Sequence, residues 1–302
     1  MIHRQDLRIR DPFILPHEGV YYLVGTGADT SLPIYRSYDL ENFEELPPIF
    51  TIDADSWAEK DTWAAEIHAY RGKFYLFVSL LGKNGLRGTQ VAVSDTPDGK
   101  YIPVKNAPIT PADQSCIDAT LFVEGDTPYI IYSHDWPDNY IEAEGVHVGE
   151  IFAAEVTPDL SDIVGEPFLL FTSREAPLSA AAPNEIFFDG ENARIFGEHV
   201  IRYGSDAPFV QRLASGALYL TWSPMLGNNY VILGVLSEGG SIRGPWRHLD
   251  VPLYDENGGH AMFFTDLDSK RRACFHAPEH APFERATLKE VVEEDGILRI
   301  LS

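Results

Sequence analysis

The chain contains an internal repeat, and this repeat constrains the fold more than any other feature of the sequence. Each copy has a short apolar strand that starts beside an acidic or polar residue, a turn at Gly or Asp, and a second, aromatic-rich strand. No long apolar pattern with the period of a helix intervenes, so each copy is predicted to be a β-hairpin. The copies lie at residues 11–26, 63–79, 117–133, 206–223 and, in more degenerate form, 258–276.

Further strands follow several copies, for example at residues 88–94 and 231–237, so each unit has roughly four strands. Most copies start about fifty residues apart, which is the length of a four-stranded propeller blade. The prediction is an all-β fold, a five-bladed β-propeller with four-stranded antiparallel blades. Because closed β architectures often use a chain of 302 residues as one unit, residues 1–302 are expected to form a single domain.

The interval between the third and fourth copies is longer than the others, and the excess lies near residues 160–204. We interpret it as the end of the third blade followed by an insertion on one face of the propeller. A degenerate sixth blade is the alternative.

A propeller places the first strand of every blade along a central channel, so early positions of the repeats converge on one axis. Carboxylates gathered in one channel raise one another's pKa, and burial adds to that cost, so such a cluster indicates a functional site. The residues expected there are Asp11, Glu66, Asp118, Asp206 and His260.

The composition excludes several classes of partner. A formal charge of −23 argues against nucleic acid and against anionic membrane surfaces, because both require a basic face. A neutral ligand stays open. The start of the sequence has no apolar stretch of signal-peptide length, and no run approaches a membrane span, so a cytoplasmic protein is expected. A secreted protein whose signal peptide had been removed would have the same sequence. Cys116 and Cys274 match no metal spacing and are expected to be buried, reduced thiols.

Five short motifs in order, at blade spacing, resemble glycoside hydrolase family 43, the arabinanase, arabinofuranosidase and xylosidase family of five-bladed propellers. The resemblance covers nearly the whole chain. Its carriers are Arg10-Asp11-Pro12-Phe13-Ile14, Trp63-Ala64-Ala65-Glu66-Ile67-His68, Ile117-Asp118-Ala119-Thr120-Leu121-Phe122, Asp206-Ala207-Pro208-Phe209 and Gly258-Gly259-His260, with a closing Glu284-Arg285-Ala286.

The resemblance implies a role for each of three aspartates. Asp11 is the general base, Asp118 tunes pKa and orientation, and Asp206 protonates the leaving oxygen. Well-known family members carry glutamate at the last position, so Asp206 is a departure, and Glu66 is the reserve for the acid although a sugar contact is preferred for it. Inverting hydrolysis needs two carboxyl groups about 6.5–9.5 Å apart on opposite sides of the scissile bond, which residues on different blades can provide.

Other residues have expected binding roles. Trp63, Trp136 and Trp222 are predicted to stack on sugar rings, with core packing as the alternative for each. The resemblance implies that His260 lies beneath the active site and contacts an ion or water. A structural calcium ion at the axis and a satisfied buried histidine both stay open, and no cofactor is required for the chemistry.

The sequence therefore predicts an inverting, exo-acting glycoside hydrolase that releases terminal pentoses from oligosaccharides or glycosides of plant-type glycans. An α-L-arabinofuranosyl residue is preferred to a β-xylosyl residue as the sugar released. Galactofuranosidase or endo-arabinanase activity stays open, as does a non-catalytic carbohydrate-binding propeller, which the Asp206 departure motivates. A retaining relative would need a Trp-Met-Asn-Asp type segment, which is absent.

Overall fold

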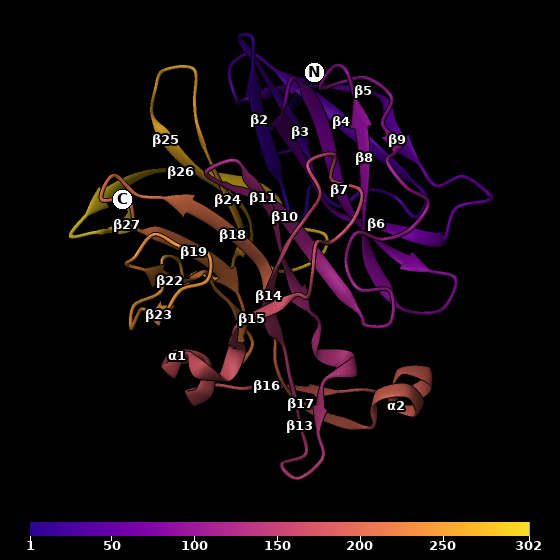
Figure 1. Ribbon diagram of the computed structural model, residues 1–302, viewed down its shortest axis with the longest axis vertical. Coiled ribbons are helices and arrows are strands. Elements are labelled where there is room, and N and C mark those ends of the chain that lie inside the picture. The colour runs from indigo at the N-terminus through magenta and orange to yellow at the C-terminus, as the bar shows by residue number, and fades with distance from the viewer. Residues whose placement is uncertain (302) are drawn as a thin grey trace.

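The protein is described by a computed structural model that covers residues 1–301, and its fold is almost entirely β (Figure 1). Helical structure in this range is limited to short pieces, which confirms the all-β prediction. They are the helices α1 (Pro177–Ala181) and α2 (Gly190–Phe196) and the 3-10 turns η1 (Trp136–Asp138) and η2 (Ser173–Glu175).

Five antiparallel sheets follow one another along the chain, and each begins with the first strand of a sequence repeat. The first consists of β2 (Phe13–His17), β3 (Val20–Val24), β4 (Ser31–Ser37) and β5 (Asn42–Thr51), with β1 (Ile2–His3) at its edge. The second consists of β6 (Ala58–Tyr70), β7 (Lys73–Gly82), β8 (Arg87–Ser94) and β9 (Ile102–Pro103).

The other three sheets have the same antiparallel order. The third consists of β10 (Cys116–Glu124), β11 (Thr127–His134), β14 (Glu150–Glu155) and β15 (Phe168–Thr172). The fourth consists of β18 (Asp206–Arg212), β19 (Leu218–Ser223), β22 (Leu233–Ser237) and β23 (Arg247–His248). The fifth consists of β24 (Gly259–Thr265), β25 (Arg271–Ala277), β26 (Arg285–Glu294) and β27 (Ile297–Ile300).

The tight turns of the first two hairpins account for their sharp reversals. The turn between β2 and β3 has positive φ at both Glu18 and Gly19, 48° and 80°, and the turn between β6 and β7 has 48° and 77° at Arg71 and Gly72. Two successive residues with positive φ define the type I′ turn, whose twist matches that of the flanking strands. The Gly-containing turns of the sequence repeat therefore fix the hairpins.

The five sheets contact one another through their first strands. Strand β2 contacts β6 and β24, β10 contacts β6 and β18, and β18 contacts β24. The N-terminal segment also joins the last sheet, since the Ile9 N–H donates to the Glu284 carbonyl at 3.2 Å and Arg8 forms a β-bridge with Arg285. The first and last sheets are thus neighbours, and the series of sheets returns to its start.

A further sheet stands apart from these five, at the lower edge of Figure 1. We call it the insertion sheet. One of its strand pairs, β13 with β17, is parallel, unlike the pairs of the other sheets. Its strands are β12 (Tyr140–Ile141), β13 (Val146–Val148), β16 (Asn184–Phe187) and β17 (His199–Tyr203), and a two-stranded ribbon follows with β20 (Met225–Leu226) and β21 (Asn229–Tyr230).

The insertion sheet accounts for the long interval between the third and fourth repeats. Strand β15 ends the third sheet, as the sequence interpretation expects, and β16 and β17 come from the excess residues. Strands β12 and β13 come from a second segment, between β11 and β14, which that interpretation did not include.

Apolar side chains of neighbouring sheets pack into a buried core. One cluster joins the first, second and fifth sheets and includes Phe43, Leu76 and Cys274. Another joins the third and fourth sheets and includes Ile131 and Trp222. Both cysteines are buried and unpaired, as expected.

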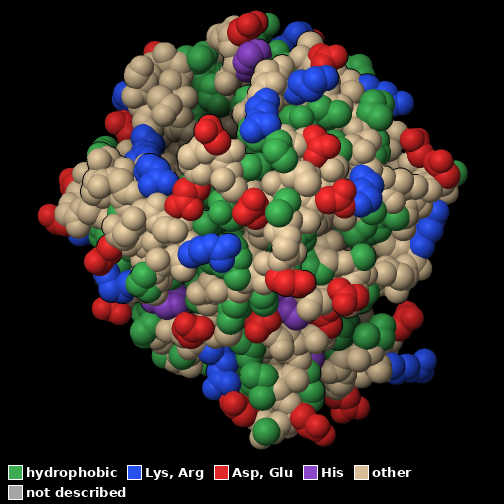
Figure 2. All heavy atoms as spheres, in the orientation of Figure 1, with side chains coloured by type: hydrophobic (Ala, Val, Ile, Leu, Met, Phe, Trp, Pro, Cys, Tyr) green, Lys and Arg blue, Asp and Glu red, His purple; other side chains and the backbone are tan. Residues whose placement is uncertain are grey.

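The visible surface carries acidic side chains interspersed with Lys and Arg (Figure 2). No helix within residues 1–301 has both the length and the apolar character needed to cross a membrane.

Candidate active site

A β-bulge interrupts the first strand of the second to fifth sheets at the same place. In β10, for example, Ile117 pairs with Ser133 and Thr120 with Ile131, so two residues oppose one. In the first sheet the equivalent residues, Asp11 and Pro12, directly precede β2, between the Thr26 N–H to Arg10 carbonyl bond and the pairing of Phe13 with Val24.

The first residue of each of these bulges, like Asp11 in the first sheet, has a positive φ without being glycine, a conformation that costs of order 1–3 kcal/mol and is concentrated at functional sites. We call these five the bulge residues, and they are Asp11 (53°), Ala64 (46°), Asp118 (56°), Ala207 (57°) and His260 (60°).

The bulge redefines which positions of the repeats are equivalent. Asp11, Asp118 and His260 occupy the same position, as predicted, whereas Asp206 lies one residue before its bulge residue and Glu66 two residues after. Successive strand residues point to opposite faces, and a bulge re-aims the side chains beside it. Asp206 and Glu66 therefore project differently from the other three.

Hydrogen bonds link the bulges of successive sheets into a ring. A side chain opposite the start of one bulge accepts the backbone N–H of the bulge residue in the next sheet. The four links are Ala64 N–H to Thr26 Oγ1 (3.0 Å), Asp118 N–H to Ser79 Oγ (2.8 Å), His260 N–H to Ser223 Oγ (2.9 Å) and Asp11 N–H to His276 Nδ1 (3.2 Å).

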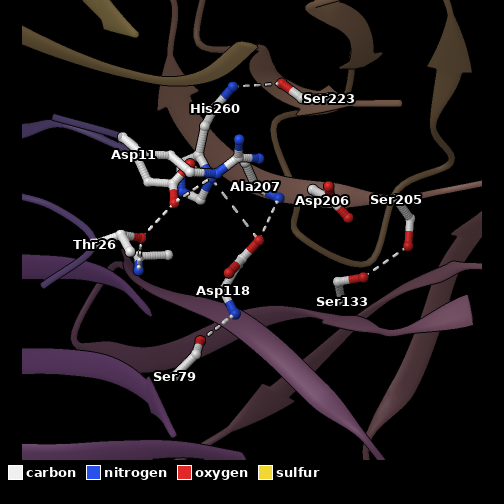
Figure 3. Close-up of polar contacts among 12 residues, drawn as sticks. Asp11, Thr26, Ser79, Asp118, Ser133, Ser205, Asp206, Ala207, Ser223 and His260 are labelled. Atoms are coloured by element: carbon white, nitrogen blue, oxygen red, sulfur yellow. Dashed lines mark hydrogen bonds and ion pairs between the residues drawn. The ribbon is translucent and has the colours of Figure 1, made fainter. Parts of the chain in front are cut away.

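The link between the third and fourth sheets is different (Figure 3). Ser133, the expected acceptor, bonds instead to Ser205 Oγ at 2.7 Å. The Ala207 N–H donates to Asp118 Oδ2 at 3.0 Å. The Asp118 carboxyl group thus takes the place of a hydroxyl in this ring of hydrogen bonds. The bond holds the Asp118 side chain against the backbone next to Asp206.

A pocket of about 330 Å³ opens where the bulges meet. Five of the residues predicted from the sequence line it. They are Asp11, Trp63, Asp118, Asp206 and His260.

The Asp11 carboxyl group lies among donors and cations. Thr26 Oγ1 donates to Asp11 Oδ2 at 2.6 Å, His260 Nδ1 is 3.1 Å from Asp11 Oδ1, and Arg10 Nε is 3.6 Å from Asp11 Oδ2. Burial would raise the pKa of Asp11, but the charges of His260 and Arg10 outweigh it and hold this pKa well below its ordinary value. Asp11 is therefore ionised throughout the neutral range.

The His260 ring is the positive partner of this carboxylate. Burial disfavours its charged form, yet the charges of Asp11 and Asp118 raise the pKa of His260 to about 9. Its Nδ1 lies 4.0 Å from Asp118 Oδ2. The imidazolium thus sits between two of the aspartates.

The pKa values of Asp118 and Asp206 are shifted in the opposite direction to that of Asp11. Burial, aided by the charges of Asp206 and Asp11 and opposed by His260, raises the pKa of Asp118 to about 7. Burial also raises the pKa of Asp206, although Arg202, His260 and Arg10 oppose the shift. One pocket therefore holds one carboxyl group whose pKa is lowered and two whose pKa values are raised.

Trp63 is the one of the three predicted tryptophans that lines the pocket. Its side chain is 38% exposed, and the Arg87 guanidinium covers one face of the ring at 3.4 Å from the centroid. Trp136 is buried against His147 and Phe196 beside the insertion sheet.

Trp222 and Glu66 do not lie where the sequence interpretation expects them. Trp222 is fully buried in the core, because its strand β19 is the second of its sheet and is covered on both faces, so it has no surface for a sugar. Glu66 is buried below the bulge, bonds to His68 Nε2 at 2.7 Å and does not line the pocket. Neither placement agrees with the predicted sugar contact.

Sequence reasoning missed three residues that line the pocket, Arg10, Thr26 and Tyr230. The Tyr230 hydroxyl lies 3.4 Å from Asp206 Oδ2 and comes from the ribbon strand β21, outside the repeat. Thr26 ends the second strand of its repeat, where other copies have Ser79 or Ser223. This recurring hydroxyl was a signal that the sequence offered.

The residues around His260 do not fit a calcium ion. Its Nδ1 faces the carboxylate of Asp11, and its raised pKa favours the cationic ring, which cannot be a metal ligand. Within residues 1–301, no group of three or more His, Cys, Asp or Glu side chains is arranged to hold a metal. The calcium site stays a sequence prediction, and no step below depends on it.

A carboxyl group with a lowered pKa and one with a raised pKa at the same pocket are suited to act as the base and the acid in hydrolysis of a glycosidic bond, the pairing that glycosidases use. Comparison with known proteins agrees. The model of the family "Glycosyl hydrolases family 43" matches residues 5–296. The chain therefore belongs to glycoside hydrolase family 43, a family of glycosidases, and the resemblance noted in the sequence is confirmed.

Solved structures of similar fold span the whole chain. An endo-arabinase from Bacteroides thetaiotaomicron is 32% identical, with a TM-score of 0.86 and 98% of each chain covered. A thermostable family-43 glycoside hydrolase is 26% identical, with a TM-score of 0.80, covering 97% of this chain and 93% of the other. A xylosidase/arabinosidase from Bacteroides ovatus is 35% identical over 102 residues, and the match spans 33% of this chain and 30% of that relative.

Proposed function

We propose that this protein is an inverting, exo-acting glycoside hydrolase that releases terminal pentoses, with α-L-arabinofuranosyl residues preferred to β-xylosyl residues. The observation that carries the proposal is the contrast between Asp11, whose pKa is depressed, and Asp206, whose pKa is raised, around one pocket. The pocket volume of about 330 Å³ lies at the small end of the range for ligand sites, which favours a single sugar unit.

The scaffold belongs to the same proposal. We take the five sheets as the blades of a five-bladed propeller with four-stranded blades. Their chain order, the contacts between their first strands and the ring of backbone hydrogen bonds between bulges support this assignment. The insertion sheet is then an addition to the third blade and no sixth blade.

Asp11 is the general base in this mechanism. Thr26 holds one of its oxygens by a hydrogen bond and His260 faces the other at 3.1 Å, and its low pKa keeps it ionised, so it can accept the proton of a water that attacks the anomeric carbon. The inverted configuration follows because this water attacks from the side opposite the leaving group.

Asp206 is the general acid. Its raised pKa favours the protonated form that a general acid needs, and the proton passes to the glycosidic oxygen as the bond to the anomeric carbon breaks. Asp118 is held by the Ala207 N–H next to Asp206, and the two buried carboxyl groups are coupled, so that ionisation of one disfavours ionisation of the other. Asp118 thus tunes the acid without touching the leaving oxygen.

Aryl glycosides of arabinofuranose and xylose test these assignments. Replacing Asp11 or Asp206 by Asn is expected to lower kcat by about 10²–10⁴-fold, the usual contribution of a general acid or base. Asp126→Asn, in the exposed turn between β10 and β11, is the matched control and should retain wild-type turnover. NMR of the first product anomer should show inversion.

Three results would count against the proposal. They are near-wild-type activity of either variant, a retained anomeric configuration, and binding of pentosides without turnover by the wild-type protein. The last of these would favour a carbohydrate-binding propeller.

An endo-acting arabinanase is a second candidate, because a second pocket adjoins the first. It has a volume of about 370 Å³ and is lined in part by Trp57, Asn84 and Arg87, and the Arg87 guanidinium stacks on Trp63 of the first pocket. Further sugar units of a chain would fit there, and the similar endo-arabinase supports such a substrate. Linear arabino-oligosaccharides distinguish the two, since exo action releases only monomer at early times and endo action releases oligomers.

A further inference from the structure

Two charged side chains from other elements, Asp135 and Arg202, lie near the proposed acid, Asp206. Asp135 follows the end of β11, Arg202 lies in β17 of the insertion sheet, and Asp206 begins β18. The hydrogen bond between Ser133 Oγ and Ser205 Oγ, 2.7 Å, joins a residue two positions before Asp135 to the residue directly before Asp206. The ends of β11 and β18 are thereby held side by side.

Asp135 is fixed in a buried position. Its side chain is 9% exposed, its Oδ1 accepts the Trp136 N–H at 2.8 Å, and its own N–H donates to the Ser115 carbonyl at 2.9 Å. Within residues 1–301 the Asp135 carboxyl group forms no direct ion pair; burial of such a group is costly, and such groups are concentrated at functional sites.

Arg202 is also held in place. Its guanidinium lies 4.8 Å from the Trp136 ring centroid, and its Nε donates to Asn184 Oδ1 at 2.8 Å. Asn184 in turn donates to the Gly227 carbonyl at 2.6 Å. Because Trp136 directly follows Asp135, the stacking positions the Arg202 charge next to the carboxyl group.

We propose that Asp135 and Arg202 are positioning residues that set the protonation of Asp206, Asp135 by holding a proton in common with it and Arg202 by opposing that effect. The proposal rests on the proposed function, in which Asp206 is the general acid. It assigns to the insertion sheet a part in the reaction, through Arg202.

The electrostatics of the cluster agree with this pairing. Burial and then the charge of Asp206 raise the pKa of Asp135 to about 8, while Arg202 lowers it. Arg202 is also the strongest of the charges that lower the pKa of Asp206. Two interacting carboxyl groups lose their protons in two separated steps, so the pair keeps one proton well above the pH at which an isolated Asp would lose it.

Other titratable groups on the neighbouring elements surround Asp135 and Asp206. Asp118 of β10 raises the pKa of Asp135. On the side of Asp206 stand His260, Arg10, Asp11 and Tyr230. His134 pairs with both Asp138 and Glu150, and the Cys116 thiol lies nearby with a pKa raised by burial and by charges that include Asp135.

The pH dependence of kcat/KM tests the proposal, because its alkaline limb reports the ionisation of the acid in the free enzyme. In Asp135→Asn the limb should move to lower pH by about one unit, since the shared proton has lost one of its two sites. In Arg202→Met it should move to higher pH by a similar amount, since an opposing positive charge is gone.

Glu185→Gln is the matched control. Glu185 is a carboxylate of the same insertion sheet that pairs with His199 at the surface and faces neither Asp135 nor Asp206. The alkaline limb of the Glu185→Gln variant should therefore coincide with that of the wild type. Unchanged limbs in both test variants, or shifts in the same direction, would overturn the proposal.

Two further measurements keep the outcome interpretable. If circular dichroism shows that Asp135→Asn does not fold, the limb of Arg202→Met decides alone, and a shift to lower pH or no shift overturns the proposal.

Asp206→Asn is assayed with a dinitrophenyl glycoside, whose leaving group needs no acid. If this variant retains full activity on substrates with poor leaving groups as well, Asp206 is not the acid and the proposed function fails. If its loss is confined to poor leaving groups while the limbs above stay unchanged, only the present inference fails.

Discussion

Gly259→Ala tests whether Tyr230 supports the acid. A Cβ on Gly259 would lie 2.4 Å from Tyr230 Cε1 and 3.0 Å from Ser223 Oγ. Carbon atoms in contact prefer about 3.5–4.0 Å, so the Tyr230 ring must move by about 1–1.5 Å. The backbone at Gly259 is not left-handed, so alanine adds a steric effect without backbone strain.

Tyr230 is closely packed, so that movement must disturb its existing contacts. The ring is 2% exposed and stacks on His276 with centroids 5.5 Å apart, and its hydroxyl is already 3.4 Å from Asp206 Oδ2. Displacement removes this hydrogen bond. We expect kcat/KM for an aryl pentoside to fall by about 10²-fold, as for other misplacements of about 1 Å, and the free energy of unfolding to fall by about 1–3 kcal/mol.

The assay combines steady-state kinetics with thermal unfolding. Gly239→Ala is the control, because no atom lies within 4 Å of its added Cβ and its φ is not left-handed. Gly259→Ala combined with Tyr230→Leu should regain stability by removing the clash but should not regain activity. Wild-type kcat/KM in the single variant, together with a lowered Tm, would show that Tyr230 contributes to packing alone.

Four other variants have expected outcomes. Thr26→Val removes the hydroxyl that donates to Asp11 and that accepts the backbone N–H of Ala64. We expect kcat to fall by about 10-fold or more and Tm to be lowered. An unchanged kcat would argue against this orientation of the base. His260→Gln removes the cation that depresses the pKa of Asp11, so the acidic limb of kcat/KM should move to higher pH. Because the pKa of His260 is raised from about 6.5 to about 9, the ring's stabilisation is complete below about pH 6.5 and lost as pH rises to about 9. The Tm difference between wild type and His260→Gln should vanish over that window. Trp63→Ala should raise KM by about 10-fold with a smaller change in kcat, whereas Trp222→Leu should lower Tm and leave KM unchanged.

Part of the site was readable because it follows the repeat. Asp11, Asp118 and His260 occupy the same position in their copies, and the structure places all three at equivalent bulge residues. The offset of Asp206 was not readable, because a bulge adds a residue to one strand without a mark in the apolar pattern. Glu66 was aligned with them for the same reason.

Other site residues escaped prediction because they belong to no repeat. Tyr230 comes from the ribbon that follows β19, and Arg202 comes from the insertion sheet. Asp135 stands at the end of β11, where only the neighbouring start of β18 gives its carboxyl group a partner. Proximity of this kind depends on how separate sheets pack, which no local pattern records.

The sequence by itself determined the hairpins, the order of the five sheets and the identity of most charged groups, because strand alternation and turn residues act over a few positions. Only the tertiary structure decided which carboxyl group has a lowered pKa and which have raised ones. Asp11, Asp118 and Asp206 are the same chemical group, and their pKa values diverge because each is buried beside a different set of charges.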